Sequence, residues 1–149
     1  MAVSSSTPQL EETWIAVQFQ LAGLTTEFEG DIPDVVRHAL DDAYAAINGE
    51  YRNLPSMYPD DGEVEAPAYD VCEIDEALLE SDGRLVVAIS FASGGDFTQE
   101  AIGELKALCC EKFAEAAAVH GIACVFTGIE RWRRLTYVEH EVVEAVEAH

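Results

Sequence analysis

The sequence predicts one α+β domain, built as a four-stranded antiparallel sheet with two helices on one face. Apolar and polar residues alternate with a period of two in several short segments, and two longer segments repeat apolar residues every three or four positions. These segments follow one another as strand, helix, strand, strand, helix and strand. The chain has 149 residues, which is long enough to bury one sizeable core.

Residues 84–91 are the most apolar and β-branched run of the chain and predict a central strand. An Asp-Gly turn precedes this run, and a Ser-Gly-Gly turn ends it. One side of the strand is fully apolar and is expected to face the helices, with residues Leu85, Val87, Ile89 and Phe91.

The other predicted strands span residues 14–21, 69–75 and 122–129. The pattern in 69–75 is the poorest, and residues 76–80 also fit a helical turn. Right-handed crossovers place the first and third strands at the centre of the sheet. Those two strands are also the most apolar, so pattern and topology agree.

The first predicted helix starts at Asp31, with Pro33 in its first turn, and runs to Asn48. The second starts at Asp96 or Thr98 and runs to His120, where a glycine follows. Both carry an apolar stripe at spacings of three and four. A third, amphipathic helix is predicted over residues 138–148, with Val138, Val142 and Val146 on one side.

This order of elements resembles the ferredoxin-like βαββαβ arrangement over residues 13–130, with the C-terminal helix added. The resemblance implies a fold and no activity, because this architecture carries many unrelated functions. We expect residues 1–12 to form a flexible tail and residues 13–149 to form the single domain, with a long loop at 50–67.

The charge of the chain is its most unusual property. Asp and Glu number 29 against 8 Lys and Arg, which leaves a net charge of −21. Such a chain repels nucleic acid and anionic membranes. Three explanations fit: a strongly basic partner, a cytosol rich in salt, or a general effect on solubility. Residues 60–82 contain ten acids and no Lys or Arg.

The residues that could carry catalytic or metal chemistry have simpler explanations. Cys72, Cys109, Cys110 and Cys124 lack the spacing of a metal site, and we expect reduced, mostly buried thiols. His140 and Glu144 could bind a metal weakly or form a solvated pair on a helix. We therefore expect no catalytic residue, metal or cofactor.

Two further motifs also have simpler explanations than a binding site. The Ser93-Gly94-Gly95 turn could hold an anion, but no Lys follows it, and a tight strand-to-helix turn explains the glycines. The cluster at 131–134, Arg-Trp-Arg-Arg, could contact nucleic acid by stacking and charge. Neutralisation of nearby Glu side chains, within the fold or across a dimer, is the preferred interpretation.

The sequence also suggests a location and an assembly. The first eight residues lack the features of a signal peptide, and no apolar run has membrane-spanning length, so we expect a cytoplasmic protein without membrane contact. The sheet face turned away from the helices would carry Trp14, Ala16, Val86 and Ala88. We expect either the segment 131–149 or a second copy to cover it, with a homodimer preferred.

The leading hypothesis is a small, acidic, non-enzymatic protein that binds a basic surface of another protein. In its concrete form it is a nucleic-acid mimic, such as a phage anti-CRISPR or anti-restriction inhibitor, without direct contact to nucleic acid. The alternative is a salt-adapted or generally acidic domain that self-associates or binds a small ligand on its open sheet face. The predicted partner-binding residues are Asp60, Asp61, Glu63, Glu65, Asp70, Glu73, Asp75 and Glu76.

Overall fold

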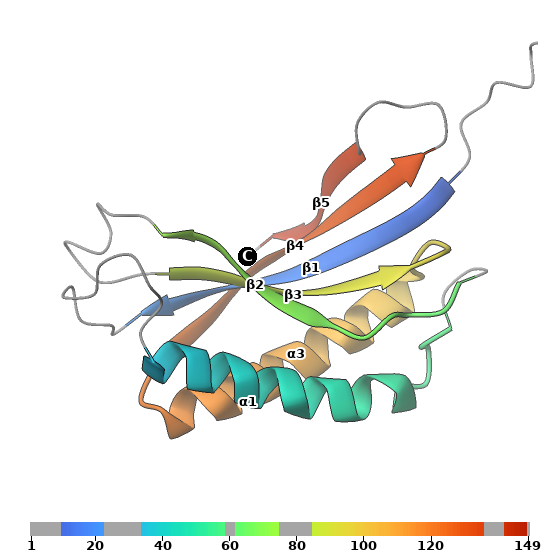
Figure 1. Ribbon diagram of the computed structural model, residues 1–149. Coiled ribbons are helices and arrows are strands. Elements are labelled where there is room, and N and C mark those ends of the chain that lie inside the picture. Colours follow the sequence, from blue (N-terminus) through green and yellow to red (C-terminus); the bar gives the residue numbers. More distant parts are fainter. Residues whose placement is uncertain (1–9, 23–33, 59–61, 75–84, 136–141, 149) are drawn as a thin grey trace, which may run out of the picture.

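The computed structural model describes residues 10–22, 34–58, 62–74, 85–135 and 142–148. It is an α+β structure in which an antiparallel sheet carries two helices on one face (Figure 1). The strands pair in the order β2-β3-β1-β4-β5. The elements are β1 (Leu10–Ala22), α1 (Asp34–Glu50), the 3₁₀ turn η2 (Tyr51–Asn53), β2 (Ala68–Ile74), β3 (Leu85–Ser93), α3 (Gln99–Val119), β4 (Ala123–Leu135) and β5 (Val142–Ala148).

The two most apolar strands lie inside the sheet, as their pattern predicts. β1 pairs with β3 and with β4, and all these pairs are antiparallel. Alternate residues of β1 and β3 lie opposite one another and are buried toward the helices. The register pairs Ile15 with Phe91, Val17 with Ile89, and Phe19 with Val87.

The apolar stripes of the helices complete the core. On α1, Val36, Leu40, Ala43 and Ile47 are buried, as predicted. On α3 the predicted stripe is buried as well, with residues Ile102, Leu105, Cys109, Phe113 and Ala116. The ring of Phe113 stacks on Phe19 of β1, with ring centroids 4.7 Å apart, and so joins the helix layer to the sheet.

The ends of α3 follow local capping chemistry. The side chain of Thr98 accepts a hydrogen bond from the Ala101 N–H at 3.1 Å, so Thr98 and not Asp96 is the N-cap. At the other end, Gly121 has φ +69, a conformation that costs glycine little. The Ile122 N–H reaches the Ala117 carbonyl at 2.8 Å and the Gly121 N–H reaches Ala118 at 3.2 Å, which is the Schellman pattern.

The prediction of a C-terminal helix is wrong, because Val142–Ala148 form the edge strand β5. β5 pairs with β4 from Gly128–Ala148 to Arg133–Val142. The apolar residues of this segment fit a helical stripe and a strand equally, and its three valines favour a strand. The length of β4 favours the strand. β4 continues to Leu135, well past the predicted end at 129, and so offers a long edge with which this segment can pair. Residues 138–141 of the predicted helix lie outside the described chain.

The same finding corrects the idea that the C-terminal segment covers the open face of the sheet, by which we mean the face opposite the helices. The described part of that segment, residues 131–135 and 142–148, widens the sheet at its edge instead. β1 begins at Leu10, inside the segment expected to be a tail. The start of β1 and the end of β4 therefore run past the helices (Figure 1).

Candidate functional site

The structure describes the side chains of two of the eight predicted partner-binding acids. Glu63 and Glu65 are exposed on either side of the buried Val64. For Asp70 and Glu73 only the backbone, in β2, is described. The remaining four, Asp60, Asp61, Asp75 and Glu76, lie outside the described residues.

The segment that carries Glu63 and Glu65 is held against the end of β3. Val64 forms an isolated bridge with Ser93, and the Glu65 N–H donates to the Ala92 carbonyl at 2.7 Å. A Cβ built on Gly62 would overlap the Ser93 hydroxyl and the Gly95 amide. Only glycine fits such a close approach, so the backbone anchors this acidic segment beside the turn after β3.

The ion pair made by Glu63 is weak. Its carboxylate lies 3.5 Å from the Arg52 guanidinium, and the two side chains are 76% and 58% exposed. Exposed pairs of this kind contribute about 0–1 kcal/mol. Glu63 therefore stays accessible to a partner.

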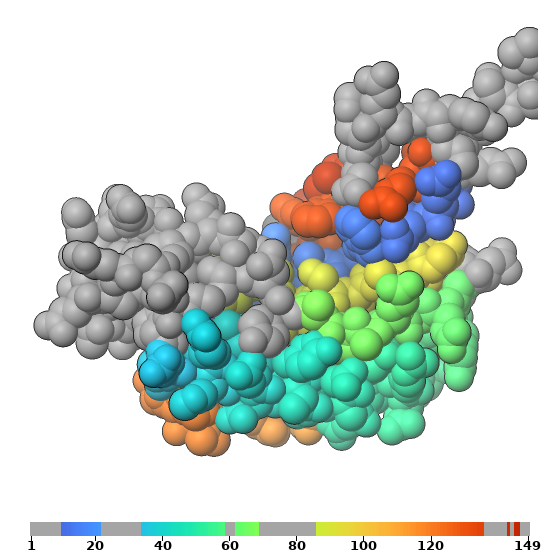
Figure 2. Space-filling model, in the orientation of Figure 1, coloured from blue at the N-terminus to red at the C-terminus, as the bar shows by residue number. Residues whose placement is uncertain are grey.

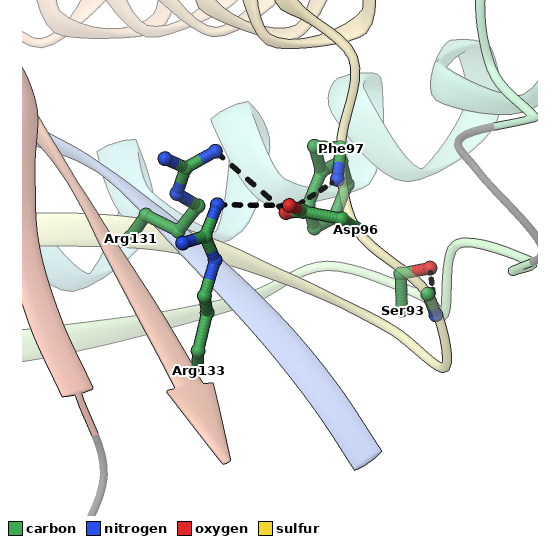
Figure 3. Close-up of polar contacts among 6 residues, drawn as sticks. Ser93, Asp96, Phe97, Arg131 and Arg133 are labelled. Carbon is green, nitrogen blue, oxygen red and sulfur yellow. Dashed lines mark hydrogen bonds and ion pairs between the residues drawn. The ribbon is translucent and has the colours of Figure 1, made fainter. Parts of the chain in front are cut away.

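A partly buried polar cluster lies beside this segment and is the best-formed group of charged residues in the described chain. Asp96, in the turn before α3, accepts from Arg133 at 2.8 Å and lies 3.6 Å from Arg131 (Figure 3). The same carboxylate accepts the Phe97 N–H at 2.9 Å. Both arginines come from β4, so the cluster ties the β3–α3 turn to the far side of β1.

The register of the strands explains why these residues meet. Thr13 of β1 lies between Ser93 of β3 and Arg133 of β4, on the helix side of the sheet. The Ser93 hydroxyl accepts the Gly95 N–H at 3.1 Å. The Thr13 hydroxyl is fully buried and has no hydrogen-bond partner among the described residues. Sequence reasoning took Asp96 for a possible helix cap and missed this cluster, since its members are up to 120 positions apart.

Asp96→Asn should lower the free energy of unfolding by about 1–3 kcal/mol, because it leaves two partly buried guanidiniums without their shared carboxylate. Urea unfolding measures this loss. Glu63→Gln removes an exposed pair and should change stability by less than about 0.5 kcal/mol. Equal effects of the two substitutions would show that the Asp96 cluster does not hold the turn.

The basic cluster of the sequence, residues 131–134, is divided between the two faces of the sheet. Arg131 and Arg133 point to the helix side and contact Asp96. Arg134 lies 3.2 Å from Glu12 on the open face, with its guanidinium 5.2 Å from the centre of the Trp14 ring. The prediction that these arginines neutralise nearby Glu side chains within the fold is confirmed for Arg134, whereas Arg131 and Arg133 contact an aspartate, Asp96.

An apolar row crosses the open face. Trp14 pairs with Ala92 on one side and with Trp132 on the other, and Trp132 pairs with Val143 of β5. The two indole rings meet edge to face at 5.9 Å. Trp132 is 36% exposed and Val143 is 54% exposed. The sequence did not predict Val143 as a member of this row, because its segment was expected to form a C-terminal helix and not the strand β5.

The surface of the helix layer is acidic, in contrast to the apolar row on the open face. Figure 2 shows α1 forming the outer surface below the sheet, with α3 beside it. The two helices carry eight acids against three bases. Lys112 lies 2.9 Å from Glu50, and the His120 ring at the end of α3 lies 2.9 Å from the Asp42 carboxylate of α1. The acids are Asp34, Asp41, Asp42, Glu50, Glu100, Glu104, Glu111 and Glu115.

The thiols whose side chains are described lie between α3 and β4. Burial raises the pKa of Cys124 to about 12, with a smaller effect of Cys110. Burial also raises the pKa of Cys109 well above its usual value. Cys109 is buried, while Cys110 and Cys124 are partly exposed, so the expectation of mostly buried thiols is met fully at Cys109 and in part at the other two.

The raised pKa of Cys124 gives a pH dependence. Below the ordinary thiol pKa of 9.0 the group is protonated in both states and its burial costs nothing. Between pH 9.0 and about 12 the unfolded chain releases this proton and the folded chain does not, so stability falls as pH rises. Urea unfolding at pH 8 and pH 10.5 should show a smaller fall for Cys124→Val than for the native chain. An equal fall would contradict the buried, protonated thiol.

Comparisons with known proteins add no family. No family model matches the chain, and no curated protein matches it. Among solved structures, the aminobenzoyl-glutamate utilization protein from Klebsiella pneumoniae matches 79% of this chain at 11% identity, with a TM-score of 0.36. The match spans 28% of that protein. Neither described helix has the length and apolar character needed to cross a membrane.

Proposed function

We propose that this chain is a small non-enzymatic protein that binds a basic surface of another protein through its carboxylates. The observation that carries the proposal is the uneven placement of charge. The helix layer has eight acids and three bases, whereas the charged side chains described on the open face along β1 and β4 are Glu12, Glu130 and Arg134. Such one-sided acidity attracts a basic partner to one part of the surface.

The concrete form of this proposal is a mimic of nucleic acid. On α3, Glu100 and Glu104 are four residues apart, as are Glu111 and Glu115, so each pair lies about 6 Å apart on one side of the helix. Glu63 and Glu65 add exposed carboxylates on a segment that Gly62 fixes in place. Rows of anions at such distances compete with phosphates for a basic groove. A cytoplasmic inhibitor of a nuclease complex, such as a phage anti-CRISPR or anti-restriction protein, is the function this chemistry fits.

The fold that presents these acids is proposed to be ferredoxin-like, with one strand added. The pairing order β2-β3-β1-β4 and the placement of both helices on one face support this assignment. β5 then widens the sheet beyond the four strands of that arrangement. The assignment implies no activity by itself.

The alternative function is a salt-adapted acidic domain that self-associates or binds a small ligand. The acids of α1 and α3 favour it, because they extend the acidic surface beyond the segment 60–82. Salt adaptation requires acids over all exposed surface. Along β1 and β4 the open face carries two acids and one base, against eight acids and three bases on the helices, and this uneven placement supports the basic partner instead.

The experiment is capture from a bacterial lysate on the immobilised full chain at about 0.1 M salt, followed by elution with duplex DNA. We expect DNA to release the retained proteins, because a mimic and DNA share one binding groove. The control is a column carrying the chain with Glu63→Lys and Glu65→Lys, which should retain less of the same proteins. Retention that DNA leaves unchanged would overturn the mimicry, and no retention above a blank column would overturn the basic partner.

A further inference from the structure

We propose that the open face of the sheet is a self-association surface, where a second copy of this chain packs on the row Ala92-Trp14-Trp132-Val143. The strand register places these four residues side by side across β3, β1, β4 and β5. Alternate residues of one strand face the same way, so the row lies opposite the helices. This inference is independent of the proposed function, because no carboxylate contact to a basic partner enters it.

The charge of the open face favours a second copy of this chain over a basic partner. Glu12 is neutralised by Arg134 at 3.2 Å, and the Glu130 carboxylate accepts the indole N–H of Trp132 at 3.3 Å. A second copy also carries −21, so it approaches most closely where acids are few. Along β1 and β4 this face has two acids, Glu12 and Glu130, against Arg134, and the register places Asp70 and Glu73 of β2 further along it, beside Ala88 and Val86. The helix layer, with its excess of acids, repels such a copy. A basic partner would be drawn to the helix layer and not to this row.

The shape of the face suits sheet-on-sheet packing. The next row of the register contains Ser90, Ala16, Glu130 and Ala145, so all its members except Glu130 are small side chains beside the indoles. Ala16 and Ala88 are nearly fully buried although they lie on the open face. Two such faces can approach to the distance of about 10 Å that is usual between packed sheets. A two-fold axis through the row would pair each indole with the apolar surface of the other copy.

The area is sufficient for a dimer of moderate affinity. Five strands spaced about 4.8 Å apart give a width of about 20 Å, and the nine residues of β3 give a length of about 30 Å. The face therefore offers about 600 Å² in each copy, or about 1,200 Å² in a pair, which is at the lower limit of specific interfaces.

The test uses sedimentation equilibrium of the full chain together with its intrinsic fluorescence. The sequence has two tryptophans, Trp14 and Trp132, and both lie in the row. We expect twice the chain mass of 16.3 kDa at high concentration, and a red shift of the tryptophan emission as dilution separates the copies. A monomer at every concentration, with constant emission, would overturn the proposal.

Two variants locate the interface. Trp132→Glu places a carboxylate inside the row and Val143→Glu places one at its β5 end, and each should weaken association at least tenfold. Val143 is 54% exposed at the sheet edge, so its substitution tests the interface even where Trp132→Glu fails to fold. The matched control is Val119→Glu on the helix layer, where the side chain is 79% exposed, and it should associate as the native chain does. A dimer that tolerates Val143→Glu and is lost with Val119→Glu would place the contact on the helices and overturn the proposal.

Discussion

Phe113→Ala should lower the free energy of unfolding by about 3–5 kcal/mol, the largest loss we expect from a single core substitution. Phe113 is fully buried on α3, and its ring stacks on Phe19 of β1 at 4.7 Å with an interplanar angle of 20°. Truncation removes the largest side chain of the α3 stripe and leaves a cavity between the helix layer and the sheet. Urea unfolding followed by circular dichroism measures the change.

Two further variants help to interpret this loss: one keeps most of the buried volume but removes the ring stacking, and the other is a control at an exposed position. Phe113→Leu keeps most of the buried volume and should cost about 1–2 kcal/mol. Val119→Ala, at an exposed position of the same helix, should change stability by less than about 0.5 kcal/mol. A loss below about 1 kcal/mol for Phe113→Ala would contradict the packing of α3 on β1.

The second large effect concerns binding. Replacing Asp60, Asp61, Glu63 and Glu65 by Lys adds eight charges and takes the net charge from −21 to −13. The fold should persist, because Glu63 and Glu65 are exposed and make at most a weak ion pair. Affinity for a protein captured and released by DNA should fall by about tenfold to a hundredfold, since repulsion replaces attraction at the contact. Titration calorimetry with the captured protein measures this loss.

A second variant puts the same charge change on the helices. Lysine at Asp34, Glu100, Glu111 and Glu115 also gives −13, at exposed positions of α1 and α3. We expect this variant to lose affinity to a similar extent, because the acids of α3 belong to the proposed binding surface. Full affinity would confine the contact to the segment beside Gly62 and contradict a contact on the helix layer.

The sequence predicted the inner part of the fold well because each strand there has a single consistent period. Ile89 of β3 and Val17 of β1 alternate with smaller or more polar residues, so one face had to be the core. The stripe of α1 was equally clear. In both cases local pattern and tertiary packing require the same residues to be buried.

The edge of the sheet could not be predicted in the same way. Val142 and Val146 satisfy a helical stripe as well as a strand, and the choice depended on the length of β4. The Asp96 cluster depends on register, which places Arg133 beside Thr13 although the two residues are 120 positions apart. Such contacts between distant residues leave no periodic signal in the sequence.

The central claim is that the acids serve a partner and not a cytosol rich in salt. The free energy of unfolding of the full chain, measured with urea at about 0.05 M and about 2 M sodium chloride, tests it most directly, because the Debye length shrinks from about 14 Å to about 2 Å between these conditions. We expect a cooperatively folded protein at the lower salt concentration, since the core described above does not depend on screening. A chain that unfolds at low salt and folds only near molar salt would contradict the claim.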